Sequence, residues 1–552
     1  MNITELEKIT EQIKRYQLED EIKDVENWLR NLNEKRIKNF VNISIEPHQL
    51  RGILKSKSLL INEAALNGDY YLEDIKFVNE AKRVGILVGL IFVAQNINSL
   101  ESRYHREDMK LIADAKTDEI AYSLRSVACS KYSLGSKYHR EDMKQTANAK
   151  TDEIATCLSN VACSYSLGSK YHREDMKQTA NAKTDKIAYS LHDVACSEDS
   201  LESKYHREDM RLIADAKTDE IAYSLRDVAR SKDSLESKCH REDMKLIANA
   251  KTDEIVACLS NVARSKDSLE SDHHREDMKL IANAKSDYIA KCLNRVAMDK
   301  NSLESKHHRE DIELISNARS NDIAICLKNV AIDKNSLESD HHREDMKLIS
   351  NTKNDNIAEC LSGVAVNRNS LESDHHREDM KLIANAKSDY IAKCLNRVAM
   401  DKNSLESKYH KEDMNLIANI TIKTILIARY SQELACNKNS LESKYHKEDM
   451  KLISSAKSGT IAGYLIDVAC NNNLLKSEHH IEDMKRLLDA KDDCDAKEIY
   501  NNIIKQYEVQ NKKEESNYVT FQEKIDAIHQ NAVEYTDGDT TKELDDSVFV
   551  LK

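Results

Sequence analysis

The stretch HREDMKLIANAKTDEIVACLSNVARSKDSLESDH, residues 240–273, decides the fold of this chain because close copies of it follow one another along the sequence. The opening His-Arg-Glu-Asp or a close variant recurs 34 residues apart, except between residues 139 and 172 (33) and between residues 410 and 446 (36). Its histidines are His105, His139, His172, His206, His240, His274, His308, His342, His376, His410, His446 and His480. A fixed period in this range is typical of stacked helical repeats.

Each unit predicts a pair of helices. Ile255, Leu259 and Val262 recur at the spacing of one helix face. We predict a first helix of about 17 residues from Ser-Leu-Glu-Ser through His-Arg-Glu-Asp-Met, and a second of about 13 residues from Thr-Asp-Glu-Ile onward. Thr252 is the predicted N-cap of the second helix, and Asp267 with Glu270 has the spacing of a capping box. One such hairpin cannot bury its own apolar face, so neighbours must stack.

The sequence therefore predicts an all-α fold, a right-handed-type α-solenoid of about 12–13 tandem helical hairpins of roughly 34 residues. Residues 71–490 form the repeats, which start near residues 71, 105, 139, 172, 206, 240, 274, 308, 342, 376, 410, 446 and 480. We expect a helical N-terminal cap in residues 1–58 and a linker in residues 59–70. A C-terminal helix is expected in residues 491–515, followed by a flexible acidic tail in residues 516–552.

Composition narrows the functional classes. The net charge is −13, which disfavours a nucleic-acid backbone or an anionic membrane as the main partner. The most apolar stretch, residues 84–94, is too short to cross a bilayer, so we expect no membrane insertion. Met1 leads directly into charged residues, and no secretion signal is expected. Thirteen cysteines without a CxxC pair indicate a reducing compartment, the cytoplasm of its own cell or of a host.

No motif in the sequence indicates catalysis, a cofactor or a metal. The His-Arg-Glu-Asp tetrapeptide lacks the glycine-rich loop and Asp-Phe-Gly of a kinase, and P-loop, GxSxG and HExxH motifs do not occur. His274 and Asp277 are spaced to touch within one helix, while adjacent histidines such as His273 and His274 point about 100° apart and cannot chelate one ion. We expect most of these histidines to be solvated or to form hydrogen bonds between repeats. The chain is therefore expected not to be an enzyme.

Differences between the units gather on the second helix, at two positions three residues apart that lie away from the apolar stripe. Free drift of a solvated surface explains such variation, and so does a surface that binds a partner. The candidate partner-binding residues are Glu119, Tyr122, Lys186, Tyr288, Lys291, Asp322, Ile325, Asn356, Glu359, Tyr390 and Lys393.

Two functional hypotheses follow. The favoured one is a non-catalytic scaffold that binds a protein or peptide through these variable faces. The alternative is a modular nucleic-acid-binding protein that reads one base per repeat. In length and hairpin form the unit resembles PPR, TPR and TAL-effector repeats, although it lacks the TPR Trp-Leu-Gly-Tyr pattern and the TAL-effector glycine pair. Aspartates in the predicted loops between the helices, such as Asp118, Asp152 and Asp253, oppose phosphate contact. Sequence alone does not set the oligomeric state.

Overall fold

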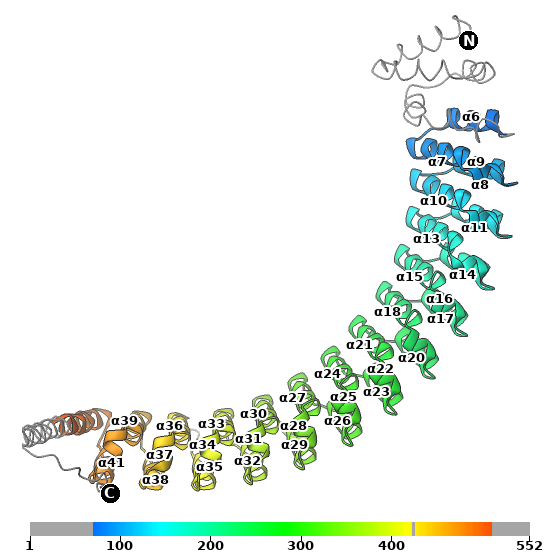
Figure 1. The fold of residues 1–552 in the computed structure, drawn as a ribbon. Helices are drawn as coiled ribbons and strands as arrows, with labels where there is room; N and C mark the ends of the chain where they lie inside the picture. Colours follow the sequence, from blue (N-terminus) through cyan, green and yellow to red (C-terminus); the bar gives the residue numbers. More distant parts are fainter. Residues whose placement is uncertain (1–69, 422–424, 510–552) are drawn as a thin grey trace, which may run out of the picture. The chain divides into compact units, whose positions relative to one another are not determined.

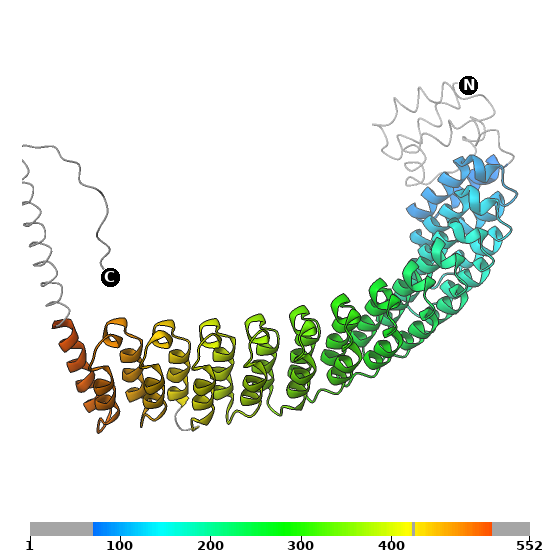
Figure 2. The same ribbon diagram turned by 60° about the horizontal axis from the view of Figure 1, so that its bottom comes forward.

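The computed structural model describes residues 70–421 and 425–509, and within these ranges the chain is all-helical, with no strand. The chain divides into two compact units, residues 1–324 and 325–552. In each unit the hairpins follow one another side by side in sequence order (Figures 1 and 2), which confirms an α-solenoid. The predicted cap in residues 1–58, the linker up to residue 69 and the tail from residue 516 lie outside the described residues. Beyond the last repeat, residues 493–509 are helical.

Each repeat between residues 71 and 479 contains three helices rather than the two that the sequence predicted. In the repeat from His240 these are the first helix α20 (His240–Ala248), the second helix α21 (Asp253–Arg264) and the short helix α22 (Lys266–Glu270). The predicted helix of about 17 residues is wrong, because the chain is extended at Ser271, with ψ of 140°. The Ser271 hydroxyl then accepts a hydrogen bond from the backbone N–H of His273 at 3.1 Å, and α23 (His274–Ala282) begins as a separate helix.

The predicted N-cap of the second helix is confirmed, whereas the predicted N-cap of the segment that follows it, Asp267, is wrong. Thr252 is the N-cap of α21, and its hydroxyl accepts from the backbone N–H of Ile255 at 3.2 Å. Asp267 is not an N-cap, because it lies inside α22. Ser265 caps that helix and accepts from the N–H of Ser268 at 3.5 Å. A side-chain oxygen two residues before Asp267 thus satisfies the free donor.

The same three types of helix recur through both units. The first helices are α6 (Tyr71–Glu80), α9 (His105–Ala113), α12 (His139–Ala147), α14 (His172–Ala180), α17 (His206–Ala214), α20, α23, α26 (His308–Ser316), α29 (His342–Asn351), α32 (His376–Ala384), α35 (His410–Asn419), α38 (His446–Ser454) and α41 (His480–Leu488). The second helices are α7 (Val84–Gln95), α10 (Asp118–Cys129), α13 (Asp152–Cys163), α15 (Asp185–Ala195), α18 (Asp219–Ala229), α21, α24 (Asp287–Ala297), α27 (Asn321–Ala331), α30 (Asp355–Ala365), α33 (Asp389–Met400), α36 (Ile425–Ala435) and α39 (Gly459–Cys470).

The short helices join each second helix to the next first helix. They are α8 (Ile97–Leu100), α11 (Lys131–Leu134), the 3-10 helix η2 (Tyr165–Gly168), α16 (Glu198–Glu202), α19 (Lys232–Glu236), α22, α25 (Lys300–Glu304), α28 (Lys334–Glu338), α31 (Arg368–Leu371), α34 (Lys402–Leu405), α37 (Lys438–Glu442) and α40 (Asn472–Leu475). The single interval of 33 residues arises here, because the segment before η2 lacks the residue that corresponds to Lys131. The two additional residues of the interval of 36 fall near residues 422–424, which lie outside the described ranges.

Within residues 1–324, and likewise within residues 325–552, a continuous core runs between the first and the second helices of the repeats. Met244 and Ile247 of α20 are fully buried, and so are Leu259 and Val262 of α21. Second helices contact the second helix of the next repeat and also the next first helix, for example α18 against α21 and α20 in residues 1–324, and α30 against α33 and α32 in residues 325–552. Burial of these side chains stabilises each repeat by roughly 1.5–3 kcal/mol per residue, but only when a neighbouring repeat is present.

The most apolar helix is α7, as the sequence predicted. Gly85 lies so close to α10 that a Cβ atom there would come within 2.3 Å of the Asp118 Cβ, so the helix approach requires glycine. In the part of the chain that the structure describes, no helix is both long enough and apolar enough to span a bilayer.

Candidate functional site

The histidine that opens each repeat from residue 105 onward is buried between two repeats. His240 lies with Nε2 3.0 Å from Asp209 Oδ2 of the preceding first helix, and with Nδ1 3.0 Å from the Ser234 hydroxyl of the short helix α19. The Tyr205 ring packs against its imidazole with centroids 4.8 Å apart. When Asp209 is ionised it accepts from Nε2–H, and Nδ1 then accepts from the Ser234 O–H. All polar atoms of this buried imidazole are therefore satisfied.

This histidine–aspartate ladder repeats within each unit. In residues 1–324 it comprises His105–Asp74, His139–Asp108, His172–Asp142, His206–Asp175, His240–Asp209, His274–Asp243 and His308–Asp277. In residues 325–552 it comprises His376–Asp345, His410–Asp379, His446–Asp413 and His480–Asp449. The predicted contact of His274 with Asp277 is wrong, since Asp277 bonds to the histidine of the next repeat, His308, at 2.9 Å. The expected hydrogen bonds between repeats are confirmed.

Adjacent histidine pairs have a related structural role. The first member occupies the position of Tyr205, and its ring packs on the buried histidine of the next repeat. His273 packs on His308, and His375 packs on His410, each with centroids 4.8 Å apart. Within a pair, the second histidine therefore contacts the preceding repeat and the first contacts the following repeat, as His274 does with Asp243 and His273 with His308.

Burial controls the electrostatics of the ladder. Desolvation raises the pKa of Asp209 above its usual value, although the hydrogen bond from His240 opposes that rise. The Asp–His–Ser order resembles a hydrolase triad in composition only. Ser234 and His240 are both 0% exposed, so no substrate can reach this hydroxyl.

At the last repeat, the buried histidine lacks the hydrogen bond from the short helix. Leu474 replaces the serine of the short helix, and the Nδ1 atom of His480 is buried without a hydrogen-bond partner. Its Nε2 still lies 3.0 Å from Asp449. An unpaired buried polar atom costs about 1–3 kcal/mol, so this repeat is held less firmly than one with serine.

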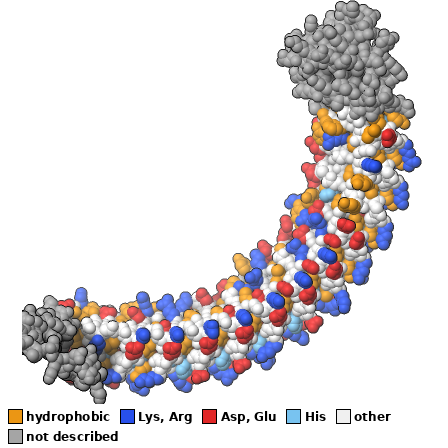
Figure 3. Space-filling view, viewed as in Figure 1, with side chains coloured by type: hydrophobic (Ala, Val, Ile, Leu, Met, Phe, Trp, Pro, Cys, Tyr) orange, Lys and Arg blue, Asp and Glu red, His pale blue; other side chains and the backbone are white. Residues whose placement is uncertain are grey.

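Two further ladders link the repeats at their surface. The Thr252 hydroxyl donates to Asp287 at the start of the next second helix at 2.6 Å. The same bond is made by Asp152, Asp185, Asp219 and Asp253, so the aspartate after the N-cap has a structural function in these repeats. Arg241 pairs with Glu208 of the preceding repeat at 2.8 Å, and the pair is solvent-exposed. Exposed pairs of this kind contribute about 0–1 kcal/mol each. Figure 3 shows basic and acidic side chains side by side along the face in view.

The repeated cysteines occupy two positions in the period, and only one of these positions lies in the core. Cys157, Cys258, Cys292, Cys326, Cys360 and Cys394 are buried. Cys129, Cys163, Cys196 and Cys470, at the other position, are only partly buried. Burial raises the pKa of Cys258 to about 11. Within the described ranges, no group of three or more histidine, cysteine, aspartate or glutamate side chains is arranged to hold a metal ion.

The predicted partner-binding residues lie on the outer side of the second helices. Nine of the eleven are exposed, and Ile325 and Tyr390 are half-buried. In residues 1–324 they are Glu119 and Tyr122 of α10, Lys186 of α15, Tyr288 and Lys291 of α24, and Asp322 of α27. In residues 325–552 they are Ile325 of α27, Asn356 and Glu359 of α30, and Tyr390 and Lys393 of α33.

Some of these side chains contact a neighbouring repeat. Lys291 forms an ion pair with Glu254 at 3.0 Å and lies 5.7 Å from the centre of the Tyr288 ring. Lys186 approaches Asp219 at 3.7 Å, and the Asn356 amide donates to Asp389 at 2.9 Å. Variation at these positions therefore changes contacts between repeats as well as the surface offered to a partner.

Sequence comparison of the units missed two exposed aromatic residues on the same side of the second helices. Tyr189 of α15 is 50% exposed, at the position of Tyr122, and Phe92 of α7 is 53% exposed. Arg125 lies 5.0 Å from the Phe92 ring centre and 5.3 Å from that of Tyr122. The signal for Tyr189 was in the sequence, since it recurs at a position that was already identified as variable.

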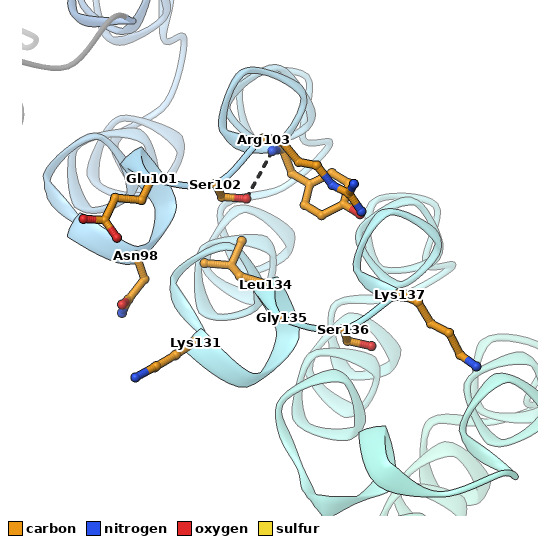
Figure 4. A pocket seen from close by; sticks show the side chains of 10 residues that line it. Asn98, Glu101, Ser102, Arg103, Lys131, Leu134, Gly135, Ser136 and Lys137 are labelled. Atoms are coloured by element: carbon orange, nitrogen blue, oxygen red, sulfur yellow. Dashed lines mark hydrogen bonds between the residues drawn. The ribbon is translucent and has the colours of Figure 1, made fainter.

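A shallow pocket of about 610 Å³ was also missed. It lies between α8 and α11 and the turns that follow them (Figure 4), and its lining includes Glu101, Arg103, Lys131 and Lys137. The sequence signal was the departure of Lys131-Tyr132-Ser133-Leu134-Gly135 from the usual short helix, which has aspartate or asparagine second and glutamate fifth.

No protein-family model and no curated protein matches this sequence.

Proposed function

We propose that this chain is a non-catalytic scaffold that binds a protein or peptide through the outer faces of its second helices. One observation carries the proposal. The side chains that join the repeats are nearly constant, whereas exposed side chains on the second helices change from repeat to repeat. Constant joints with a variable surface are typical of repeat proteins that present an extended binding face.

The composition of this face supports a protein partner. Tyr189 and Tyr288 are half or more exposed, at 50% and 59%. Large exposed aromatic residues on rigid helices are the residue type most enriched at binding hot spots. Glutamates such as Glu119 and Glu254 occupy, in other second helices, the position that Tyr288 has in α24. These carboxylates disfavour the alternative of a nucleic-acid reader.

The other parts of the proposal concern chemistry and compartment. We propose that the chain has no enzymatic activity of its own, since the Asp–His–Ser groups that join the repeats are buried. Thirteen free thiols favour a reducing intracellular compartment, and we propose the cytoplasm.

The test compares two triple variants of the tagged full-length chain in cell lysate at near-physiological salt. The face variant is Tyr189→Ala with Tyr288→Ala and Lys291→Ala. The control variant, Lys245→Ala with Arg275→Ala and Lys279→Ala, alters exposed side chains of first helices. We expect a discrete protein partner that survives nuclease treatment, that the control variant retains and that the face variant loses. A partner retained by the face variant, or nucleic acid that elutes steeply with salt, would overturn the proposal.

A further inference from the structure

Two consecutive short helices, α11 and η2, combine an exposed tyrosine with the loss of the usual glutamate. The fifth residue of the usual segment is glutamate, and it pairs with the lysine four residues before it, as in Lys232–Glu236 at 4.0 Å and Lys266–Glu270 at 3.8 Å. At α11 and η2 this glutamate is replaced by Gly135 and Gly168. Lys131 therefore lacks the carboxylate that its equivalents contact.

The fold does not require these glycines. Gly135 has ordinary helical angles, with φ of −76°, and a Cβ atom there would meet its nearest neighbour at 3.4 Å. A Cβ atom at Gly168 would meet nothing within 4 Å. A glutamate would therefore fit at both positions, as it does in the other repeats. The loss of the two carboxylates changes the surface and not the backbone.

The same two segments expose tyrosine. Tyr132 is 78% exposed and Tyr165 is 81% exposed, at the position where other repeats have aspartate or asparagine. Arg103, Lys137 and Lys170 are exposed nearby, and each lies over the ring of the tyrosine that follows it, at 4.8, 4.9 and 4.8 Å. We call Arg103, Lys131, Lys137 and Lys170, together with Tyr132 and Tyr165, the basic patch.

The basic patch is short and is bounded by acidic side chains. Residues 130–138 and 164–171 contain lysine but neither aspartate nor glutamate. On one side Glu101 lines the pocket beside Lys131, and on the other α16 carries Glu198, Asp199 and Glu202. A long polyanion such as single-stranded nucleic acid would extend over these carboxylates and be repelled. A ligand no longer than two repeats meets the cations and tyrosines, and of these acidic side chains it meets only Glu101, at the edge of the pocket.

We propose that the basic patch binds a short acidic peptide segment of a partner protein. The lysine and arginine side chains neutralise its carboxylates, the phenol groups of Tyr132 and Tyr165 donate hydrogen bonds to it, and the pocket between α8 and α11 receives one of its side chains (Figure 4). This site is separate from the second-helix faces, so it stands or fails independently of the scaffold proposal.

The experiment measures binding of a fluorescein-labelled oligoglutamate peptide to the full-length chain by fluorescence anisotropy at low salt. The restored variant is Tyr132→Asp, Gly135→Glu, Tyr165→Asp and Gly168→Glu. It should fold normally, because α19 and α22 have aspartate and glutamate at the same positions. We expect its affinity for the peptide to fall by about tenfold or more, which corresponds to about 1.4 kcal/mol.

A gain-of-binding variant provides the matched control. This variant carries the substitutions of the restored variant together with Asp233→Tyr, Glu236→Gly, Asp267→Tyr and Glu270→Gly. The tyrosines and glycines that distinguish α11 and η2 then stand in α19 and α22 instead. Binding of oligoglutamate should return. The proposal is overturned if wild-type protein does not bind the peptide, if the restored variant binds as tightly as wild type, or if labelled single-stranded RNA binds the patch and oligoglutamate does not. The face variant described above should leave oligoglutamate affinity unchanged, which separates this result from the scaffold test.

Discussion

The Nε2 atom of His240 lies 3.0 Å from a carboxylate oxygen of Asp209, a residue of the preceding repeat. Both side chains are buried, so the bond joins two repeats at a point from which water is excluded. Removal of one partner from a buried pair costs about 3–5 kcal/mol, because the other partner is left desolvated and unpaired. The constant tetrapeptide of this chain is therefore a joint between neighbouring repeats.

His240→Ala should lower the free energy of unfolding by about 3–5 kcal/mol. Arg241→Ala, at the next residue, is the control, because its partner Glu208 is 32% exposed and the pair is worth about 0–1 kcal/mol. Urea unfolding followed by circular dichroism compares the two, and hydrogen exchange locates the loss at α17 and α20. Equal effects of the two substitutions would contradict a joint at His240.

Asp209→Asn should change the pH dependence of stability. Burial raises the pKa of Asp209 in the folded chain, so its stabilising contribution is fully present below its unfolded pKa and is lost as pH rises through the raised folded pKa. Wild type should therefore gain stability relative to Asp209→Asn as pH falls from 7 toward the unfolded value of about 3.9. Urea midpoints of both proteins at several pH values measure this difference. A wild type that weakens relative to the asparagine variant on acidification would refute the assignment.

The period of the sequence was sufficient to predict the helical hairpin and the second helix of each repeat. Thr252 could be recognised as an N-cap because its hydroxyl acts within three residues, on the N–H of Ile255. Ile255 and Leu259 identified the buried face in the same way. Such local signals lie within one turn of helix and need no knowledge of the neighbouring repeat.

The break at Ser271 and the partner of each histidine could not be predicted in this way. Ser-Leu-Glu-Ser and His-Arg-Glu-Asp-Met are both compatible with helix, so nothing local separates α22 from α23. The break lets Ser268 of α22 reach Nδ1 of His274 at 3.0 Å. Asp277 has the spacing to touch His274 but bonds to His308, because the distance between stacked repeats, and not the spacing along one helix, decides the contact.

Thr146→Ile should stabilise the chain. Thr146 is 0% exposed and its hydroxyl has no hydrogen-bond partner, while the repeat from His240 has Ile247 at the same position. An unpaired buried hydroxyl costs about 1–3 kcal/mol, and the substitution removes it. The matched control is Thr179→Ile, because the Thr179 hydroxyl donates to the Asp175 carbonyl oxygen at 2.9 Å. The gain in urea-unfolding free energy should be larger at residue 146 by about 1 kcal/mol, and a larger gain at residue 179 would contradict the contact pattern.

The cysteines should differ widely in their rate of alkylation. Cys494 is exposed, whereas Cys258 is buried and its pKa is raised to about 11 by desolvation. Only the thiolate reacts, and at pH 8 a thiol with that pKa is ionised to about one part in a thousand. Iodoacetamide treatment of the native chain, followed by mass spectrometry of its peptides, should show modification of Cys494 well before Cys258. Denaturation in urea is the control, since it should bring the two rates together. Rapid native labelling of Cys258 would mean that α21 opens readily, and the tight packing of that helix against α18 and α24 would then be wrong.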